Sequence, residues 1–166
     1  MSGRIGGTMH DYAAIRRLIP HAHPILLVDR VLEMDPYDRI VTTKTVSGCE
    51  PCYGRLAPDL ETRAFAYPPS LLMESWGQGG AVLWMERIKA QQREREGALI
   101  LAATRNVQLH RSVYPGDTLR HVVRVDQYVG DNVILSGESF VGDELVATVG
   151  YAMAVMRPSE RVAWEA

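Results

Sequence analysis

Runs of apolar and β-branched residues, separated by turn sequences, recur along the chain. Two such runs, residues 25–34 and 39–47, flank the turn-forming sequence at residues 35–38 and predict a hairpin. A short helix with Asp11 as its cap precedes them and should end near Pro20. The first third of the chain therefore predicts a helix followed by two paired strands.

The last third of the chain predicts four more strands. They cover residues 98–113, 120–129, 133–141 and 145–156, with short Gly-Asp turns between the later ones. Short turns between successive strands are typical of antiparallel neighbours, so the order predicts a four-stranded meander.

A long helix is predicted between these two β-rich parts. It follows an irregular loop at residues 48–67, begins with Ser70 as its cap, and runs to about Glu96 with Gly97 as its stop. Up to Met85 the helix is apolar on nearly all sides, which predicts burial all round, and the remainder is strongly charged.

Three glycines in this apolar half, Gly77, Gly79 and Gly80, each cost up to about 1 kcal/mol relative to alanine. We expect compensation from a backbone that packs very close to a sheet or a ligand. The predicted fold is α+β, a single domain in which one antiparallel sheet wraps around a long central helix. We expect a flexible segment at residues 1–9, the domain at 10–160 and a tail at 161–166.

Composition adds little to the predicted fold but narrows the kinds of protein that the chain could be. The chain has 166 residues, 46% of them hydrophobic and 23% charged, and a net charge of -2. These values fit one soluble domain and favour neither a nucleic-acid nor a membrane partner. The first residues lack the apolar core of a secretory signal, and no segment is apolar enough to span a bilayer, so we expect a cytoplasmic protein.

Cys49 and Cys52 form a C-x-x-C sequence that is compatible with a redox pair or half of a zinc site. Zinc needs four ligands, there is no second pair, and the surrounding sequence predicts a loop rather than a helix start. We therefore interpret both as incidental reduced thiols and predict no metal site. No glycine-rich phosphate loop and no G-x-S-x-G sequence is present.

Glu74 is the candidate catalytic residue. Acidic residues near a helix start are common because they complement the helix dipole. The flanking residues Leu72, Met73 and Trp76 nevertheless predict burial, and an unpaired buried carboxylate is costly. Gln78, four residues on, lies on the same helix face and is placed to orient the carboxylate by a hydrogen bond. A carboxylate with its own orienting group is typical of an active site.

Several segments together resemble the 3-hydroxyacyl-acyl-carrier-protein dehydratases of the hot-dog fold. They are HAHPILLVDRVLEMDP, IVTTKTVSGCEP, PPSLLMESWGQGG, VYPGDTLRHVVRV and VGDELVATV, between about Ile19 and Met156. The resemblance implies a curved sheet around a central helix and a dimer. It also implies that Glu74 is the catalytic acid, with Gln78 matching the family's glutamine one turn later.

One departure from the family concerns the base. The family carries a Gly-His-Phe-Pro loop before the helix, and its histidine is the catalytic base. Here the loop has Gly54-Arg55-Leu56-Ala57-Pro58, with Arg55 in the place of that histidine. A guanidinium stays protonated in proteins, so Arg55 cannot be the base. The loop is also longer than in the family, and Pro69 replaces a glycine.

Dehydration of a 3-hydroxyacyl thioester needs a base at C2, an acid for the leaving hydroxyl and donors for the thioester oxygen. Four explanations of the missing base stay open. A partner subunit supplies the histidine in a heterodimer, or His23 moves into its place. Alternatively, Glu74 acts alone with water, in isomerisation or as a hot-dog thioesterase. In the fourth, the chain is a non-catalytic acyl-binding or scaffolding subunit.

The resemblance also implies a substrate carried on the phosphopantetheine of acyl carrier protein, with no other cofactor. Residues expected around this substrate are Arg55, Tyr53, Tyr67, Trp76 and Gly80.

Other charged residues and the long loop have weaker interpretations. Arg55, Arg63, Arg105 and Arg111 form either a docking patch for the carrier or an ordinary surface. The segment 59–67 is either a lid over the site or a tolerated insertion. Of the remaining histidines, His10 lies in the leading segment, whereas His110 and His121 lie on strands and are predicted to face solvent.

Overall fold

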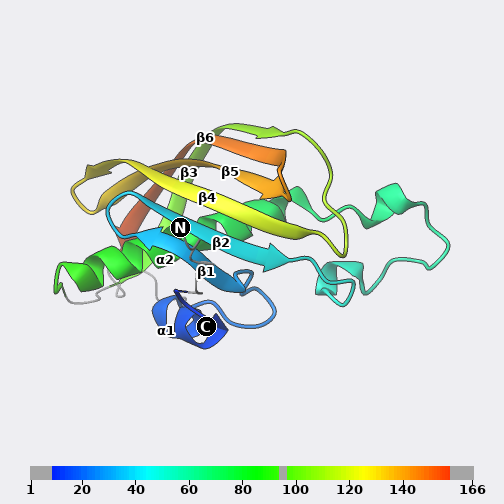
Figure 1. Cartoon of the computed structure of the whole chain (residues 1–166), viewed down its shortest axis with the longest axis horizontal. Coiled ribbons are helices and arrows are strands. Elements are labelled where there is room, and N and C mark those ends of the chain that lie inside the picture. Colours follow the sequence, from blue (N-terminus) through cyan, green and yellow to red (C-terminus); the bar gives the residue numbers. More distant parts are fainter. Residues whose placement is uncertain (1–8, 94–96, 158–166) are drawn as a thin grey trace, which may run out of the picture.

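A six-stranded antiparallel sheet wraps around one long helix in the computed structural model, which describes residues 9–93 and 97–157 (Figure 1). The sheet order is β1-β2-β4-β5-β6-β3. The helices are α1 (Tyr12–Leu18) and α2 (Pro69–Ala90), and the strands are β1 (Arg30–Asp35), β2 (Arg39–Thr45), β3 (Ala98–Leu109), β4 (Thr118–Val129), β5 (Asn132–Val141) and β6 (Glu144–Arg157). The α+β single-domain prediction is confirmed. Most of the predicted flexible end and the whole predicted tail lie outside the described residues.

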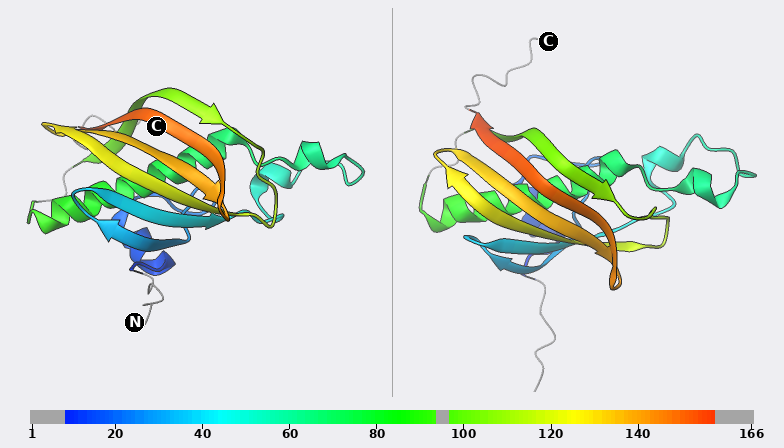
Figure 2. Two further views of the ribbon diagram at one scale, coloured as in Figure 1. Left: turned by 45° about the horizontal axis from the view of Figure 1, so that its top comes forward. Right: turned by 90° about the horizontal axis from the view of Figure 1, so that it is seen from above.

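The predicted hairpin of β1 and β2 is confirmed, but the predicted four-stranded meander is wrong at its first strand. Strands β4, β5 and β6 do pair in succession, whereas β3 pairs with β6. The segment after β3 crosses the end of the sheet, so that β4 pairs with β2 instead. This crossing joins the hairpin to the rest of the sheet and leaves β3 as an edge strand, visible along one rim in Figure 2.

Strand β1 begins at Arg30 rather than at Ile25, because helix α2 takes over the hydrogen bonds that a strand would need. The Leu27 N–H donates to Gln78 Oε1 (2.8 Å), and the Leu27 carbonyl accepts from Ser75 Oγ (2.6 Å). The segment before β1 is therefore fixed to the helix by side chains, where sequence propensity alone predicts a sheet partner.

Helix α2 starts at Pro69, with Pro68 as its cap, so the prediction that Ser70 is the cap is wrong. It ends at Ala90, earlier than the predicted Glu96, and residues 94–96 lie outside the described part of the chain. Most of its apolar half is buried, as predicted. One face is not, because Glu74, Gly77 and Ala81 are each only partly covered. These three positions are spaced by three and four residues, so they form one stripe along the helix.

The long loop between β2 and α2 extends away from the sheet at the start of α2 (Figures 1 and 2). It contains two short 3-10 turns, Pro51–Tyr53 and Thr62–Phe65, and most of residues 54–64 are exposed. Residues 59–64 of the segment interpreted as either a lid or an insertion are exposed, whereas Tyr67 is buried beside the start of α2.

Two of the three helix glycines lie against the sheet, as the sequence predicts. A Cβ atom on Gly80 would lie 2.7 Å from Leu135 Cδ1, and one on Gly79 would lie 3.2 Å from Thr42 Oγ1. A Cβ on Gly77 would meet nothing within 4 Å. The close approach of helix and sheet thus accounts for Gly79 and Gly80 but not for Gly77.

This difference predicts different effects of two alanine substitutions on stability. Gly77→Ala is expected to raise the free energy of unfolding by about 0.5–1 kcal/mol, because it removes a glycine from a helix interior at no steric cost. Gly80→Ala is expected to lose that gain, because Leu135 must shift to admit the new methyl group. Urea unfolding of both variants checks this. An equal gain in both would mean that Gly80 is not constrained by the sheet.

Candidate active site

An open cleft lies between the uncovered stripe of α2 and strand β3. Its lining includes four of the predicted site residues, Glu74, Trp76, Gln78 and Gly80, together with the unpredicted His21. The remaining lining residues are apolar or glycine: Gly77, Ala81, Leu99, Leu101, Leu135 and Ala154.

Glu74 is the carboxylate of this cleft, and it is less buried than the sequence predicts. Its side chain is 39% exposed, and its Oε1 atom accepts a hydrogen bond from Gln78 Nε2 (2.7 Å) and lies 3.4 Å from His21 Nε2. The His21 contact, followed by the Gln78 hydrogen bond, holds the pKa of Glu74 below its ordinary value, although partial burial opposes this. These contacts favour the carboxylate form of Glu74, whereas the resemblance implies that Glu74 is the catalytic acid.

Gln78 positions Glu74 through a side-chain amide whose nitrogen and oxygen are both hydrogen-bonded. The side chain is 2% exposed, and its Nε2 donates to both Glu74 Oε1 and the Ile25 carbonyl, at 2.7 Å each. Its Oε1 accepts from the Leu27 N–H. These three partners permit one orientation of the amide. The contacts support the orienting role predicted for Gln78.

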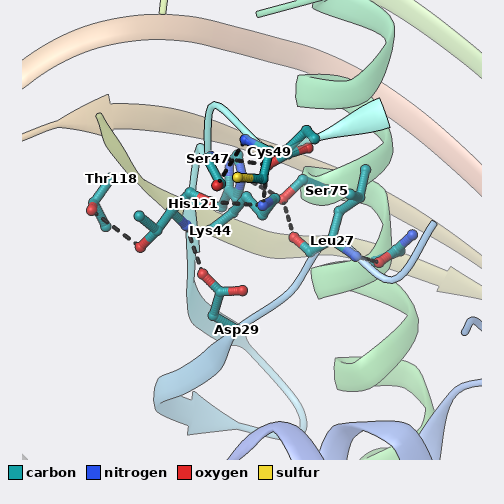
Figure 3. Close-up of polar contacts among 11 residues, drawn as sticks. Leu27, Asp29, Lys44, Ser47, Cys49, Ser75, Thr118 and His121 are labelled. Carbon is teal, nitrogen blue, oxygen red and sulfur yellow. Dashed lines mark hydrogen bonds and ion pairs between the residues drawn. The ribbon is translucent and has the colours of Figure 1, made fainter. Parts of the chain in front are cut away.

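A buried histidine lies directly behind the helix, and the prediction that His121 faces solvent is wrong. His121 on β4 is 0% exposed, with Nδ1 2.7 Å from Ser139 Oγ and Nε2 2.9 Å from Ser75 Oγ (Figure 3). Because Ser75 Oγ donates to the Leu27 carbonyl, it accepts from His121 Nε2–H, and Ser139 donates to Nδ1. Burial lowers the pKa of His121 to about 3, so the ring is neutral. A sequence signal existed, because His121 lies two positions from each of the core residues Leu119 and Val123 and therefore on the same face of the strand.

The other predicted site residues lie away from Glu74. His23 is exposed and does not line the cleft, and Arg55 is exposed on the projecting loop. Tyr53 and Tyr67 belong to a second apolar cluster near the start of α2. Burial raises the pKa of Tyr53 to about 12 and raises that of Tyr67 as well. One chain thus brings together the helix residues of the predicted site but not the loop residues.

The four arginines proposed as a docking patch differ in their surroundings. Arg63 pairs with Glu61, and Arg111 pairs with Asp117 and Glu144. Arg105 lies over the Tyr151 ring at 5.5 Å. The paired carboxylates reduce the positive charge that Arg63 and Arg111 offer to an acidic carrier.

Cys49 and Cys52 are free thiols, the first exposed and the second partly buried. Among residues 9–93 and 97–157, no group of three or more His, Cys, Asp or Glu side chains could hold a metal ion. Within the same ranges, no helix has the length and apolar character needed to cross a membrane.

Comparison with known proteins identifies the family. The chain is 34% identical over 149 residues to the 3-hydroxyacyl-acyl-carrier-protein dehydratase FabZ of Cupriavidus metallidurans, covering 86% of this chain and 95% of that one. It is 36% identical over 140 residues to FabZ of Natranaerobius thermophilus, covering 84% and 92%.

Among solved structures, the dehydratase heterocomplex ApeI:P from Xenorhabdus doucetiae has a similar fold, with a TM-score of 0.73 at 17% identity over 89% of this chain and 93% of that one. No family model matches the chain. The two FabZ relatives match nearly their whole length, and their dehydratase family is the one that the sequence motifs resemble. The chain belongs to the hot-dog family of 3-hydroxyacyl-acyl-carrier-protein dehydratases.

Proposed function

We propose that this chain is the Glu-bearing subunit of a 3-hydroxyacyl-acyl-carrier-protein dehydratase of fatty-acid or polyketide assembly, and that a partner subunit supplies the base. The substrate is an acyl chain held on the phosphopantetheine of acyl carrier protein, and no other cofactor takes part. The observation that carries this proposal is Glu74, held by Gln78 at the wall of an open, otherwise apolar cleft.

The position of the cleft at the sheet edge supports a two-chain site. Four large apolar side chains of β3, Ile100, Leu101, Val107 and Leu109, are 38–49% exposed. Leu101 also lines the cleft beside Glu74. A second subunit pairing along β3 would bury these side chains and cover the cleft in one step.

The loop that carries Arg55 supports the same arrangement. The loop extends away from the sheet of its own chain, and Arg55 does not line the cleft, so that a neighbouring chain is its natural target (Figure 2). A partner with a histidine at the corresponding place would bring a base to Glu74. The structurally similar ApeI:P is itself a dehydratase heterocomplex.

The reaction divides between the two subunits. The partner's imidazole removes the C2 proton, and the C2–C3 double bond forms as the C3–O bond breaks. A proton passed through the Glu74 carboxyl group protonates the C3 hydroxyl, which leaves as water. The apolar lining of the cleft binds the acyl chain and excludes solvent from these steps.

Mixing subunits tests the proposal. The purified chain alone is expected to form no enoyl product from a 3-hydroxyacyl-carrier substrate, because it lacks the base. A co-expressed homologue that carries the Gly-His-Phe-Pro loop is expected to restore turnover to the mixed dimer. To separate the mixed dimer from a homodimer of the homologue, that homologue's own helix glutamate is replaced by glutamine.

The control removes the homologue's loop histidine, which should abolish the restored activity. Full turnover by this chain alone would disprove the need for a partner. No turnover in any combination, with a correctly assembled complex, would point to an acyl-binding or scaffolding subunit.

Hydrolysis of an acyl thioester is a second candidate, favoured by the ionised state of Glu74. A carboxylate can activate water directly, and the lowered pKa of Glu74 favours that form. Release of free thiol from an acyl thioester, without an enoyl product, would support this alternative.

A further inference from the structure

We propose that His21 stores the proton that Glu74 delivers to the leaving hydroxyl, so that the acid of this site is a histidine–carboxylate pair within one chain. This inference rests on the proposed dehydratase function and deepens it. His21 is the first residue of the segment HAHPILLVDRVLEMDP but had no role in the site expected from the sequence, and it stands two residues before the candidate His23.

The residues that precede and follow His21 in the sequence are both fixed by the fold, and they hold His21 against Glu74. Before it, Ile19 is buried in the main core. After it, the Ala22 carbonyl accepts from the N–H groups of Ile25 and Leu26, at 2.8 and 3.0 Å. Gln78 then ties Ile25 to the helix through its carbonyl. The same glutamine thus fixes both members of the pair.

The contact between the two side chains is long enough to tighten. His21 Nε2 lies 3.4 Å from Glu74 Oε1, longer than a strong hydrogen bond, and such distances shorten in complexes with substrate. The Gln78 hydrogen bond uses the same oxygen, so Oε2 is left to meet the substrate. His21 Nδ1 is buried and has no hydrogen-bond partner among the described residues, so the fold alone does not satisfy this ring.

The two side chains are the only titratable groups among the described residues that line the cleft. Strands β3, β5 and β6 contribute Leu99, Leu101, Leu135 and Ala154 to its walls, and α2 contributes Trp76, Gln78, glycine and alanine besides Glu74. Within the described part of this chain, a proton held in the cleft has only Glu74 and His21 to share it. Imidazole is ordinarily the stronger base of the two groups, so the proposal places the stored proton on His21.

With this pair as the acid, every proton that the reaction takes up or releases is accounted for. At the start the pair carries one proton, on His21. As the C3–O bond breaks, the pair gives that proton through the Glu74 carboxyl group to the hydroxyl, which leaves as water. The base meanwhile holds the C2 proton and releases it to solvent, and the pair takes a proton back from solvent.

The pH profile of kcat for His21→Gln tests this role in the active complex. Without His21 the carboxyl group alone must hold the proton, and carboxyl and imidazole groups ordinarily titrate about two pH units apart. The ratio of wild-type to variant kcat is therefore expected to rise from a few-fold at pH 5 to about 100-fold at pH 8. His23→Gln, the same change at an exposed histidine two residues away, should keep a ratio near one throughout.

A ratio that is constant across pH would show that His21 only shapes the site, and would overturn the proposal. So would a ratio near one. If the wild-type complex forms no enoyl product at all, the dehydratase function itself fails, which is a different result from a wild-type rate that His21→Gln leaves unchanged.

A second measurement does not depend on activity. Because His21 is the main cause of the lowered pKa of Glu74, His21→Gln is expected to raise that pKa in a carbon-13 NMR titration of the Glu74 carboxyl group, whereas His23→Gln should not. An unchanged titration would show that the pair does not exist in solution.

Discussion

Replacing Glu74 with glutamine is expected to reduce dehydration by about 100- to 10,000-fold in the active complex. The substitution keeps the shape of the side chain but removes the group proposed to pass a proton to the leaving hydroxyl. The fold should be preserved, because Gln78 can donate to the new amide oxygen and the side chain is 39% exposed. The measurement is enoyl product formed per second under saturating substrate.

Glu86→Gln is the matched control for this experiment. Glu86 lies three turns further along α2 and faces His10 at 3.2 Å, so it repeats a glutamate–histidine pair on the same helix. It does not line the cleft. Its substitution is expected to leave the dehydration rate close to that of the wild type. Undiminished turnover in Glu74→Gln would remove Glu74 from the mechanism.

His121 is expected to make the chain sensitive to acid. Its pKa is about 3 in the folded protein and ordinarily about 6.5, so below pH 6.5 the unfolded chain binds a proton that the folded chain does not. Stability is therefore lost as the pH falls from 6.5 towards 3, and the loss from this residue stops below that value. The full effect is on the order of 4–5 kcal/mol, about 3 kcal/mol of which is lost by pH 4.

Comparison with His121→Gln isolates this contribution. Glutamine can still hydrogen-bond but does not titrate, so the variant should be less stable than wild type at pH 7 by about 1–3 kcal/mol. The wild-type lead should shrink as the pH falls and reverse between about pH 6 and pH 4, because only the wild type loses the His121 contribution and all other titrating groups are shared. Urea unfolding at several pH values measures this, with the exposed His110→Gln as the control. Parallel curves with a constant gap would show that the burial of His121 does not govern its protonation.

The fold was largely predictable because its signals are local. Turn residues marked the β1–β2 and β5–β6 connections, and the unusual run of apolar residues marked α2. What could not be predicted was long-range pairing. Nothing in the sequence of β3 indicates that it pairs with β6 instead of β4, because that choice depends on the path of residues 110–117 across the end of the sheet.

The sequence predicted the helix residues of the candidate site, Glu74 and Gln78, but not His21 on the segment beside the helix. The i, i+4 spacing of Glu74 and Gln78 follows from helix geometry alone. The approach of His21 depends instead on a non-helical segment that Gln78 fixes in place, a contact between residues 53 positions apart. Within this chain the apolar face around Glu74 stays uncovered beside β3, and burial of that face, as the sequence predicts, depends on a second subunit.

The uncovered rim of β3 bears on how much of this protein a cell can keep. An exposed strand edge with apolar side chains favours pairing with other strands, and unpaired molecules are prone to aggregation or degradation. Under the proposed two-subunit arrangement, synthesis of this chain would need to match that of the subunit that covers the edge, and an excess of unpaired chain would be degraded.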